Sequence, residues 1–509
     1  MGAKTLMLQG TASHVGKSLL TAALCRILTQ QGYRVAPFKA QNMSLNAAVC
    51  EGGEIGRAQA LQAAACRRPA TVDMNPLLLK PCGTGGCQLI VQGRPAGFMA
   101  AAEHGRYSPA IIAAVEQSFE RLTASHDIVV LEGAGSPAEV NLLDRDIANM
   151  WMAERADAPV LMVGDIERGG VFAALLGTWL LVPHAARIRG FLVNKFRGDA
   201  GLLTSGLKFL QQRTGVPVLG VVPYGDPQLP EEDSLALGAR ADAGAGLKIG
   251  VVRLPHLANF TDFEPLERTP GVALRYVATV EELRQSQAVI LPGTRSSVAD
   301  LAWLRHTGLA DALAGQAAAG IPVLGICGGF QMLGAGISDE HGVESGELQT
   351  PGLQLLPVST RFGRDKVTTQ VTARLQAGAE SGPAYQIHHG RVTRDGGMPL
   401  FTMESAHGLI GEEGCRRGHI WGTTLHGVFD APGLRRQILQ DWAAWDAGPT
   451  AAPETTLDAR LDAWADWVRR SVAITEIFAL AGLQPPADGN LPPLPQAPGG
   501  LQAGGPSDD

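Results

Sequence analysis

This chain of 509 residues has no Cys-x-x-Cys pair, no long apolar run and no excess of positive charge. Its seven cysteines form no Cys-x-x-Cys pair, so neither a disulfide framework nor a zinc site is indicated. The longest apolar run, residues 170–182, is too short to cross a bilayer. The net charge of −7 argues against nucleic-acid or membrane-surface binding as the main task.

The remaining composition is that of a globular protein, with 45% hydrophobic and 18% charged residues. A chain of this length is too long to fold around a single hydrophobic core, so we expect two α/β domains plus appendages. We place the first domain at residues 1–235, a Gly/Ala-rich linker at 236–246 and the second domain at 247–445. A helical appendage is expected at 446–483 and a disordered Pro/Gly-rich tail at 484–509. The first residues lack the layout of a signal peptide, which favours a cytoplasmic location.

A cysteine at a strand–helix junction organises the second domain. The apolar run 323–326 reads as a buried strand; Cys327, Gly328 and Gly329 follow it, and a helical pattern begins at Phe330. Such a layout is typical of a nucleophile elbow, because glycines permit a strained backbone and a helix N-terminus favours thiolate. A small buried cysteine would explain the residue types equally well when the stretch is taken alone.

A histidine distant in sequence could activate this thiol. His426 ends a short β-rich run at 422–429 and is our first candidate, with His388 and His389 as competitors. A strand at 288–291 ends in a glycine turn, so backbone N–H groups near Gly293 and Gly328 are candidates for an oxyanion hole.

A phosphate-binding loop is indicated in the first domain. An apolar strand at 4–8 leads into residues 10–18, which read GTASHVGKS, and a helical pattern follows over 19–31. In such a loop backbone N–H groups cradle phosphates, Lys17 reaches the β/γ oxygens and Ser18 holds Mg²⁺. Five residues instead of the usual four separate Gly10 from Gly16. A glycine-rich turn with an exposed lysine is the alternative.

Polar residues end several further strands of this domain, as expected where a parallel sheet binds a ligand. Glu132 is thereby placed to meet Mg²⁺ near the phosphates, and Asp165 is a second acidic candidate. Lys39, Asn42 and Asn194 are candidate contacts for substrate or nucleotide.

Together these stretches resemble the cobyric acid synthase family, over nearly the whole chain to about residue 480. The loop at 10–18 is similar to that of dethiobiotin synthetase-like ATPases. Six further segments are similar to signatures of the family, and they lie at 41–46, 54–59, 74–81, 132–139, 165–172 and 194–199. The second half resembles a class I glutamine amidotransferase domain.

The resemblance implies an ATP- and Mg²⁺-dependent enzyme that transfers the amide nitrogen of L-glutamine to adenosylcobyrinic acid a,c-diamide. It implies a Cys327–His426 dyad without the usual triad acid, because Gly427 follows His426 where other members of the class carry Pro-x-Glu. Gln331 would help to seat glutamine. The family commonly has glutamate where this chain has Gln386, which puts an ionic role there in doubt.

Three alternatives remain open. The nearest is cobyrinic acid a,c-diamide synthase, which shares the architecture but amidates two other carboxylates. A dethiobiotin synthetase-like carboxylase fused to an unrelated thiol hydrolase is the second, and a partition-type ATPase module that switches partners is the third. The sequence leaves the oligomeric state open.

Overall fold

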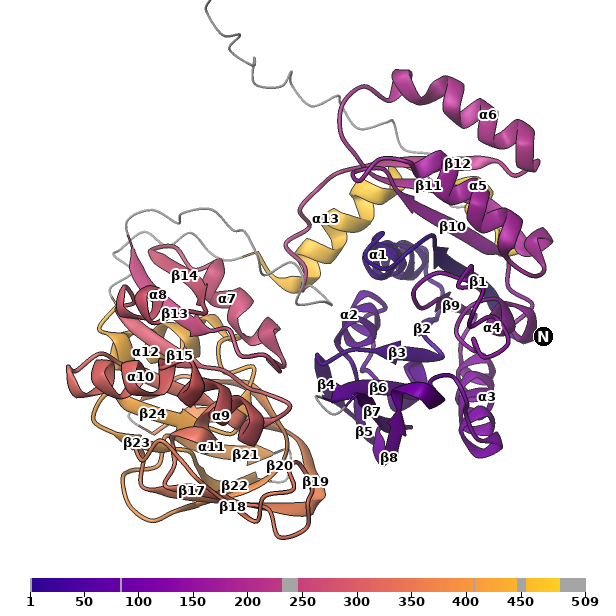
Figure 1. Cartoon of the computed structure of the whole chain (residues 1–509). Helices are drawn as coiled ribbons and strands as arrows, with labels where there is room; N and C mark the ends of the chain where they lie inside the picture. Colours follow the sequence, from indigo (N-terminus) through magenta and orange to yellow (C-terminus); the bar gives the residue numbers. More distant parts are fainter. Residues whose placement is uncertain are drawn as a thin grey trace, which may run out of the picture.

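Two α/β domains lie side by side in the computed structural model (Figure 1). The structure describes residues 2–82, 85–230, 246–376, 378–405, 408–445 and 455–485. Nearly all of the expected linker and tail therefore lies outside the described residues. No helix within these described ranges is long and apolar enough to cross a bilayer.

The first domain is built on a six-stranded parallel sheet of order β12-β11-β10-β1-β9-β2. Its strands are β1 (Lys4–Gly10), β2 (Val35–Phe38), β9 (Ile128–Glu132), β10 (Val160–Asp165), β11 (Ile188–Phe196) and β12 (Val218–Pro223). Its helices are α1 (Lys17–Gln30), α2 (Arg57–Ala65), α3 (Pro109–Ser125), α4 (Met150–Arg155), α5 (Val171–Leu181) and α6 (Thr204–Thr214). The apolar strands predicted from the sequence form this sheet, which confirms the α/β assignment.

Alternation along the central strand sends side chains into two cores, one on each face of the sheet. Leu6 and Leu8 of β1 pack with α1 on one face, whereas Met7 packs with α3, α4 and α5 on the other. All three are almost fully buried, as expected for a strand covered on both sides.

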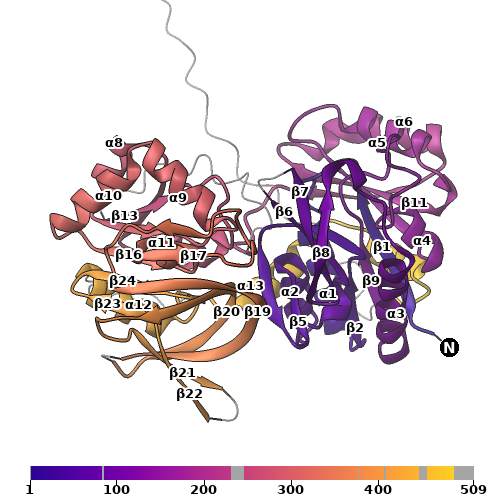
Figure 2. The same ribbon diagram turned by 60° about the horizontal axis from the view of Figure 1, so that its bottom comes forward.

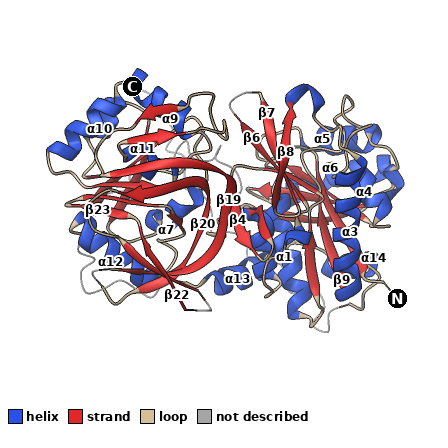
Figure 3. Cartoon of the chain, turned by 90° about the horizontal axis from the view of Figure 1, so that it is seen from below, coloured by secondary structure: helices blue, strands red, loops and turns tan. Residues whose placement is uncertain are grey.

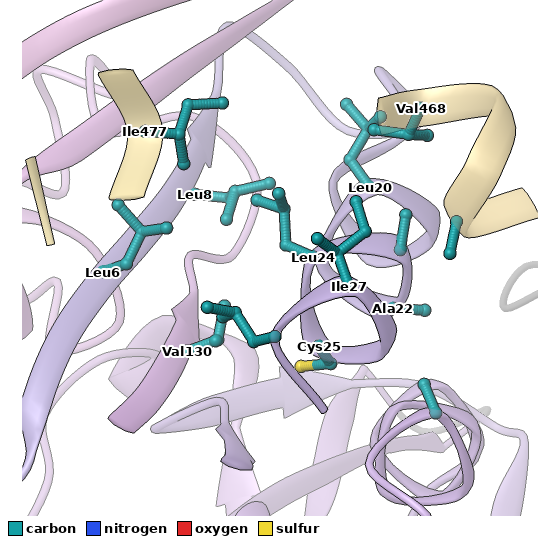
Figure 4. Packing of buried hydrophobic residues seen from close by; sticks show 14 of the residues in the cluster. Leu6, Leu8, Leu20, Ala22, Leu24, Cys25, Ile27, Val130, Val468 and Ile477 are labelled. Carbon is teal, nitrogen blue, oxygen red and sulfur yellow. The ribbon is translucent and has the colours of Figure 1, made fainter. Parts of the chain in front are cut away.

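The C-terminal helices α13 (Leu457–Arg469) and α14 (Ile474–Leu480) return to the first domain. Figure 4 shows Val468 and Ile477 packing into the core formed by β1 and α1. Nε1 of Trp464 donates to the Leu19 carbonyl at 2.8 Å, and the Ala473 N–H donates to the Leu219 carbonyl at 2.7 Å. These helices therefore complete the hydrophobic core on one face of the first sheet.

Two smaller sheets of the first domain lie on the side of the second domain (Figure 2). One has the order β3-β6-β7-β8, and its strands are β3 (Gln41–Met43), β6 (Leu77–Cys82), β7 (Gly86–Val91) and β8 (Arg94–Ala100). The other pairs β4 (Ala47–Cys50) with β5 (Gly53–Gly56).

The second domain holds a six-stranded sheet of order β14-β13-β15-β16-β24-β23, parallel except at β23. Its strands are β13 (Leu247–Val252), β14 (Val272–Val277), β15 (Ala288–Leu291), β16 (Val323–Ile326), β23 (Cys415–Arg417) and β24 (Ile420–Thr423). The helices of this domain are α7 (Glu264–Glu267), α8 (Val280–Arg284), α9 (Ser297–His306), α10 (Leu309–Ala318), α11 (Gly328–Leu333) and α12 (Pro432–Ala443).

A mainly antiparallel second sheet in this domain is dominated by two long strands, β19 (Val358–Leu375) and β20 (Ser381–Arg394). It also contains β17 (Gly336–Ser338), β18 (Gln349–Pro351), β21 (Phe401–Ser405), β22 (Gly408–Glu413) and β25 (Leu425–His426).

The domains meet where β19 and β20 of the second domain lie against β4 of the first (Figure 3). Strand β19 also contacts β5. Tyr385 and Ile387 of β20 share a small apolar core with Ala47, Val49 and Leu78 of the first domain, among other residues.

A buried ion cluster also joins the domains: the Glu54 carboxylate accepts hydrogen bonds from Lys80 of its own domain and from Lys366 of the second. Burial alone would raise the pKa of Glu54, but the two lysines outweigh it and lower the pKa to about 2.

Candidate active site

Cys327 sits in a strained elbow, as the sequence predicts. It follows β16 and precedes α11, with φ +50° and ψ −109°, a conformation that non-glycine residues rarely adopt. Its N–H donates to the Thr423 carbonyl at 2.7 Å, which fixes the elbow against β24. A Cβ at Gly329 would lie 1.9 Å from the Leu291 carbonyl oxygen, so only glycine allows the helix to approach β15 this closely.

His426 lies beside this elbow, and the expected dyad has a third member. Nδ1 of His426 donates to Oδ2 of Asp262 at 2.6 Å, and the Gly427 N–H donates to Oδ1 of the same carboxylate at 3.1 Å. Asp262 stands on a short 3₁₀ helix, Phe260–Phe263, far from the position at which the class usually carries its acid. The usual acid after His426 is absent, as expected, but a carboxylate from another element of the fold lies beside the imidazole of the predicted Cys327–His426 pair.

The electrostatics around His426 favour its protonated form. Burial alone would lower the pKa of His426, but Asp262 and Cys327 outweigh it and raise the pKa to about 10. A hydrogen bond with Cys327 is among these contributions. The ring of Tyr385 stacks on the imidazole, with centroids 5.3 Å apart and planes inclined by 20°. An imidazolium held in this way stabilises a neighbouring thiolate.

The two competing histidines lie in the same region but lack such support. Burial lowers the pKa of His388 and of His389 to about 4, so both rings are neutral near pH 7. Neither ring nitrogen of His388 has a hydrogen-bond partner among the described residues. Gln386 pairs with Leu425 across β20 and β25, and its Nε2 donates to Thr424 Oγ1 at 2.7 Å.

A cavity opens in front of Cys327 and is walled by both domains. Gly293, Gly328, Gln331 and His426 line it from the second domain, and Leu45 and Lys80 line it from the first. A Cβ on Gly293 would come within 3.0 Å of His426 Cε1, so a side chain there would press on the imidazole. The structure thus gathers the predicted oxyanion and glutamine residues around the thiol, at the boundary between the domains.

The predicted phosphate loop joins β1 to α1. Gly16 precedes the helix with φ +97°, and a Cβ there would lie 2.1 Å from Nδ2 of Asn194. Lys17 lies over the loop, where its Nζ donates to the carbonyls of Ala12 and Gly135 at 2.9 Å each. Gly10 is equally enclosed, since a Cβ there would meet Val15 and Lys17. This closed loop at a helix N-terminus suits an anionic phosphate chain.

The carboxylate of Glu132 lies at the foot of this loop. Its Oε1 accepts from Ser18 Oγ and from Lys39 Nζ, each at 2.8 Å, and its Oε2 accepts from Gln62 Nε2 at 2.5 Å. One hydroxyl and one carboxylate are hard oxygen donors of the kind that hold Mg²⁺ together with substrate phosphates and water. Ser18 and Glu132 therefore fit a magnesium ion, and Lys39 lies at the same place.

The remaining candidates lie around this centre in different ways. Asn194 contacts the loop directly, because its Nδ2 donates to the Val15 carbonyl at 2.8 Å. Asp165 instead pairs with Lys195 at 2.9 Å and accepts a hydrogen bond from the Glu167 N–H at 2.8 Å. Asn42 is buried in the first domain and donates to Gln59 Oε1 at 3.1 Å.

Comparison with known proteins follows this division of the chain. Residues 6–235 match the CobQ/CobB/MinD/ParA nucleotide binding domain, and residues 248–433 match the CobB/CobQ-like glutamine amidotransferase domain. A cobyric acid synthase of Sorangium cellulosum is 50% identical over 491 residues, which cover 90% of this chain and 94% of that protein. The chain belongs to the cobyric acid synthase family.

Other cobyric acid synthases match over nearly their full length. That of Syntrophobacter fumaroxidans is 46% identical over 94% of this chain and 99% of its own, and that of Desulforudis audaxviator is 47% identical over 95% and 100%. A solved glutamine amidotransferase is 22% identical and covers 39% of this chain and all of its own, with a TM-score of 0.31. Membership of the cobyric acid synthase family makes the chain a glutamine-dependent amidating ligase.

Proposed function

We propose that this enzyme amidates the b, d, e and g carboxylates of adenosylcobyrinic acid a,c-diamide in cobalamin biosynthesis, with glutamine as nitrogen donor and ATP as phosphoryl donor. The observation that carries the proposal is the pairing, in one chain, of a Cys327–His426–Asp262 trio with a phosphate loop. The former suits release of ammonia from an amide, and the latter suits activation of an acid.

In the glutamine half, the Cys327 thiolate attacks the side-chain amide carbon. Backbone N–H groups near Gly293 and Gly328 receive the developing oxyanion. His426 gives its proton to the departing nitrogen, and Asp262 holds the ring through Nδ1 so that Nε2 is the nitrogen that exchanges the proton. Water then hydrolyses the thioester to glutamate.

In the synthetase half, a carboxylate must first gain a better leaving group than oxide. Phosphoryl transfer to it gives an acyl phosphate, which ammonia attacks with loss of phosphate. Lys17 and the loop N–H groups bind and orient the phosphates, while Ser18 and Glu132 would hold a magnesium ion. When bound, that ion offsets negative charge on the phosphates. Lys39, Asn42 and Asn194 are proposed contacts of substrate or nucleotide, and Asp165 is a weaker one because it is paired with Lys195.

Ammonia must travel between the two halves without meeting bulk water, where it would be protonated. The position of the Cys327 cavity supports a direct passage, because residues of the first domain form part of its wall.

Mass spectrometry of adenosylcobyrinic acid a,c-diamide incubated with enzyme, ATP, Mg²⁺ and glutamine tests the proposal. Four added amides are expected. No mass change on this substrate, combined with two additions to cobyrinic acid, would instead identify an a,c-diamide synthase.

A further inference from the structure

A carboxylate and a guanidinium face the same cavity as Cys327, and the glutaminase chemistry uses neither of them. Glu344 lies on the loop between β17 and β18, and Arg295 lies on the turn between β15 and α9; both line the cavity together with Gln331. Glutamine carries an α-ammonium and an α-carboxylate, and each charge needs a partner when the amino acid is enclosed. The cavity therefore offers one group of each required sign.

Glu344 is held firmly in place. Its Oε1 accepts from the Val298 N–H at 2.9 Å, and its Oε2 lies 3.4 Å from Ser297 Oγ. The same hydroxyl donates to Oε1 of Gln331 at 3.1 Å, which connects the carboxylate to the predicted glutamine-seating residue. Behind it, Asp339 Oδ2 accepts from the N–H of Glu344 at 2.8 Å and anchors the loop. A carboxylate fixed in this way is pre-oriented for a cation.

Within the described ranges, no lysine or arginine forms a salt bridge with Glu344. Desolvation raises its pKa to about 7, outweighing the lowering by the Val298 N–H and by Arg295. An ammonium ion placed against the carboxylate would favour its ionised form.

Arg295 is positioned by the other domain. Its Nη2 donates to Oε1 of Gln88 on β7 at 2.8 Å. Its Nε is buried and finds no acceptor within the described part of the chain. A carboxylate in the cavity would supply that acceptor, and a guanidinium suits it because its donors are arranged in a fixed fork.

We propose that Glu344 binds the α-ammonium and Arg295 binds the α-carboxylate of the glutamine whose side-chain amide meets Cys327. The inference rests on the proposed use of glutamine. It names the two side chains by which the enzyme would distinguish glutamine from other primary amides. Because Gln88 of the first domain holds Arg295, the synthetase domain helps to shape the glutamine site.

The test compares glutamine with two analogues in the full-length enzyme, by measuring ammonia release. 4-Carbamoylbutanoate lacks the α-amino group, and L-glutaminamide lacks the charge of the α-carboxylate. In the wild type each loss should lower kcat/KM at least 100-fold. Glu344→Gln should lower kcat/KM for glutamine about 100-fold but change that for 4-carbamoylbutanoate less than threefold, and Arg295→Gln should show the same selectivity towards L-glutaminamide.

Matched controls keep the result clear. Glu340→Gln and Arg364→Gln alter exposed residues of the same charge in this domain and should change neither ratio. Ammonium-dependent amidation reports whether each variant is folded. If Glu344→Gln folds poorly, Glu344→Asp replaces it in the test, and this variant should still prefer glutamine over 4-carbamoylbutanoate. Equal losses with glutamine and with the matching analogue would overturn the assignment. A wild type that releases no ammonia from glutamine would instead contradict the proposed function.

Discussion

Oδ2 of Asp262 lies 2.6 Å from Nδ1 of His426, although 164 residues separate the two in the chain. The carboxylate fixes the orientation of the imidazole and raises its pKa, and we therefore infer that Asp262 is a positioning residue for the proposed thiol chemistry.

Replacement of Asp262 by Asn should lower glutamine-dependent kcat about 100-fold or more, because the imidazolium loses its counter-charge. The pKa of His426 should also fall, which would move the acidic and basic limbs of the glutaminase pH profile. Steady-state assays over a pH series measure both effects. Asp311→Asn, at an exposed helical position, is the control. An unchanged pH profile in Asp262→Asn would show that Asp262 serves only the structure of its 3₁₀ helix.

Cys327→Ser and Lys17→Ala should differ in whether ammonium can still serve as the nitrogen source. The serine variant should lose glutamine use and keep amidation with high ammonium, because only the nitrogen source is affected. The alanine variant should lose more than 100-fold with either nitrogen source, since phosphoryl transfer serves both. Corrinoid mass analysis measures the products. Failure of Cys327→Ser with ammonium would show that the two sites do not divide the work as proposed.

Gly293→Ala should reduce glutamine-dependent turnover at least tenfold. The added methyl group would stand 3.0 Å from His426 Cε1 and 3.8 Å from Cys327 Cβ, displacing the ring or the thiol. Ammonium-dependent turnover should stay within twofold of the wild type. Gly315→Ala on α10 is the matched control, because its Cβ would meet nothing within 4 Å. Wild-type glutaminase activity in the Gly293 variant would mean that the ring tolerates this crowding.

The Glu54 cluster should make stability depend on pH at acidic values. The pKa of Glu54 is lowered to about 2 in the folded protein, so its contribution is present above its unfolded pKa of about 4.5. It is lost as the pH falls from there towards 2. Glu54→Gln should lower the free energy of unfolding by about 3 kcal/mol at pH 7, because Lys80 and Lys366 lose their shared counter-ion.

Calorimetric Tm values at pH 7 and at pH 3 measure this prediction, and the difference between them should be smaller in Glu54→Gln than in the wild type. Glu51→Gln, exposed and close to Glu54 in sequence, should behave as the wild type does. A Tm at pH 7 equal to that of the wild type would show that the two lysines are stabilised without Glu54.

Local patterns were enough to locate the elbow and the phosphate loop. Each consists of consecutive residues in which glycine is required by the backbone. Gly16 has a positive φ, and Gly329 lies so close to the Leu291 carbonyl that no Cβ would fit. Asp262 escaped prediction because its partner His426 comes from a strand far along the chain, and the sequence after His426 lacks the acid that the class usually carries there. The shared walls of the Cys327 cavity escaped prediction for the same reason, since Lys80 and Arg295 line one cavity only when the two domains dock.

The path of the chain also constrains how the enzyme can be divided. A fragment ending at residue 235 would lack α13 and α14, and it would leave the apolar side of α1 open to solvent where Trp464 and Val468 now cover it. We expect such a fragment to aggregate. A stable stand-alone synthetase would need residues 455–485 grafted back, for example through a short flexible tether replacing the whole glutaminase insert.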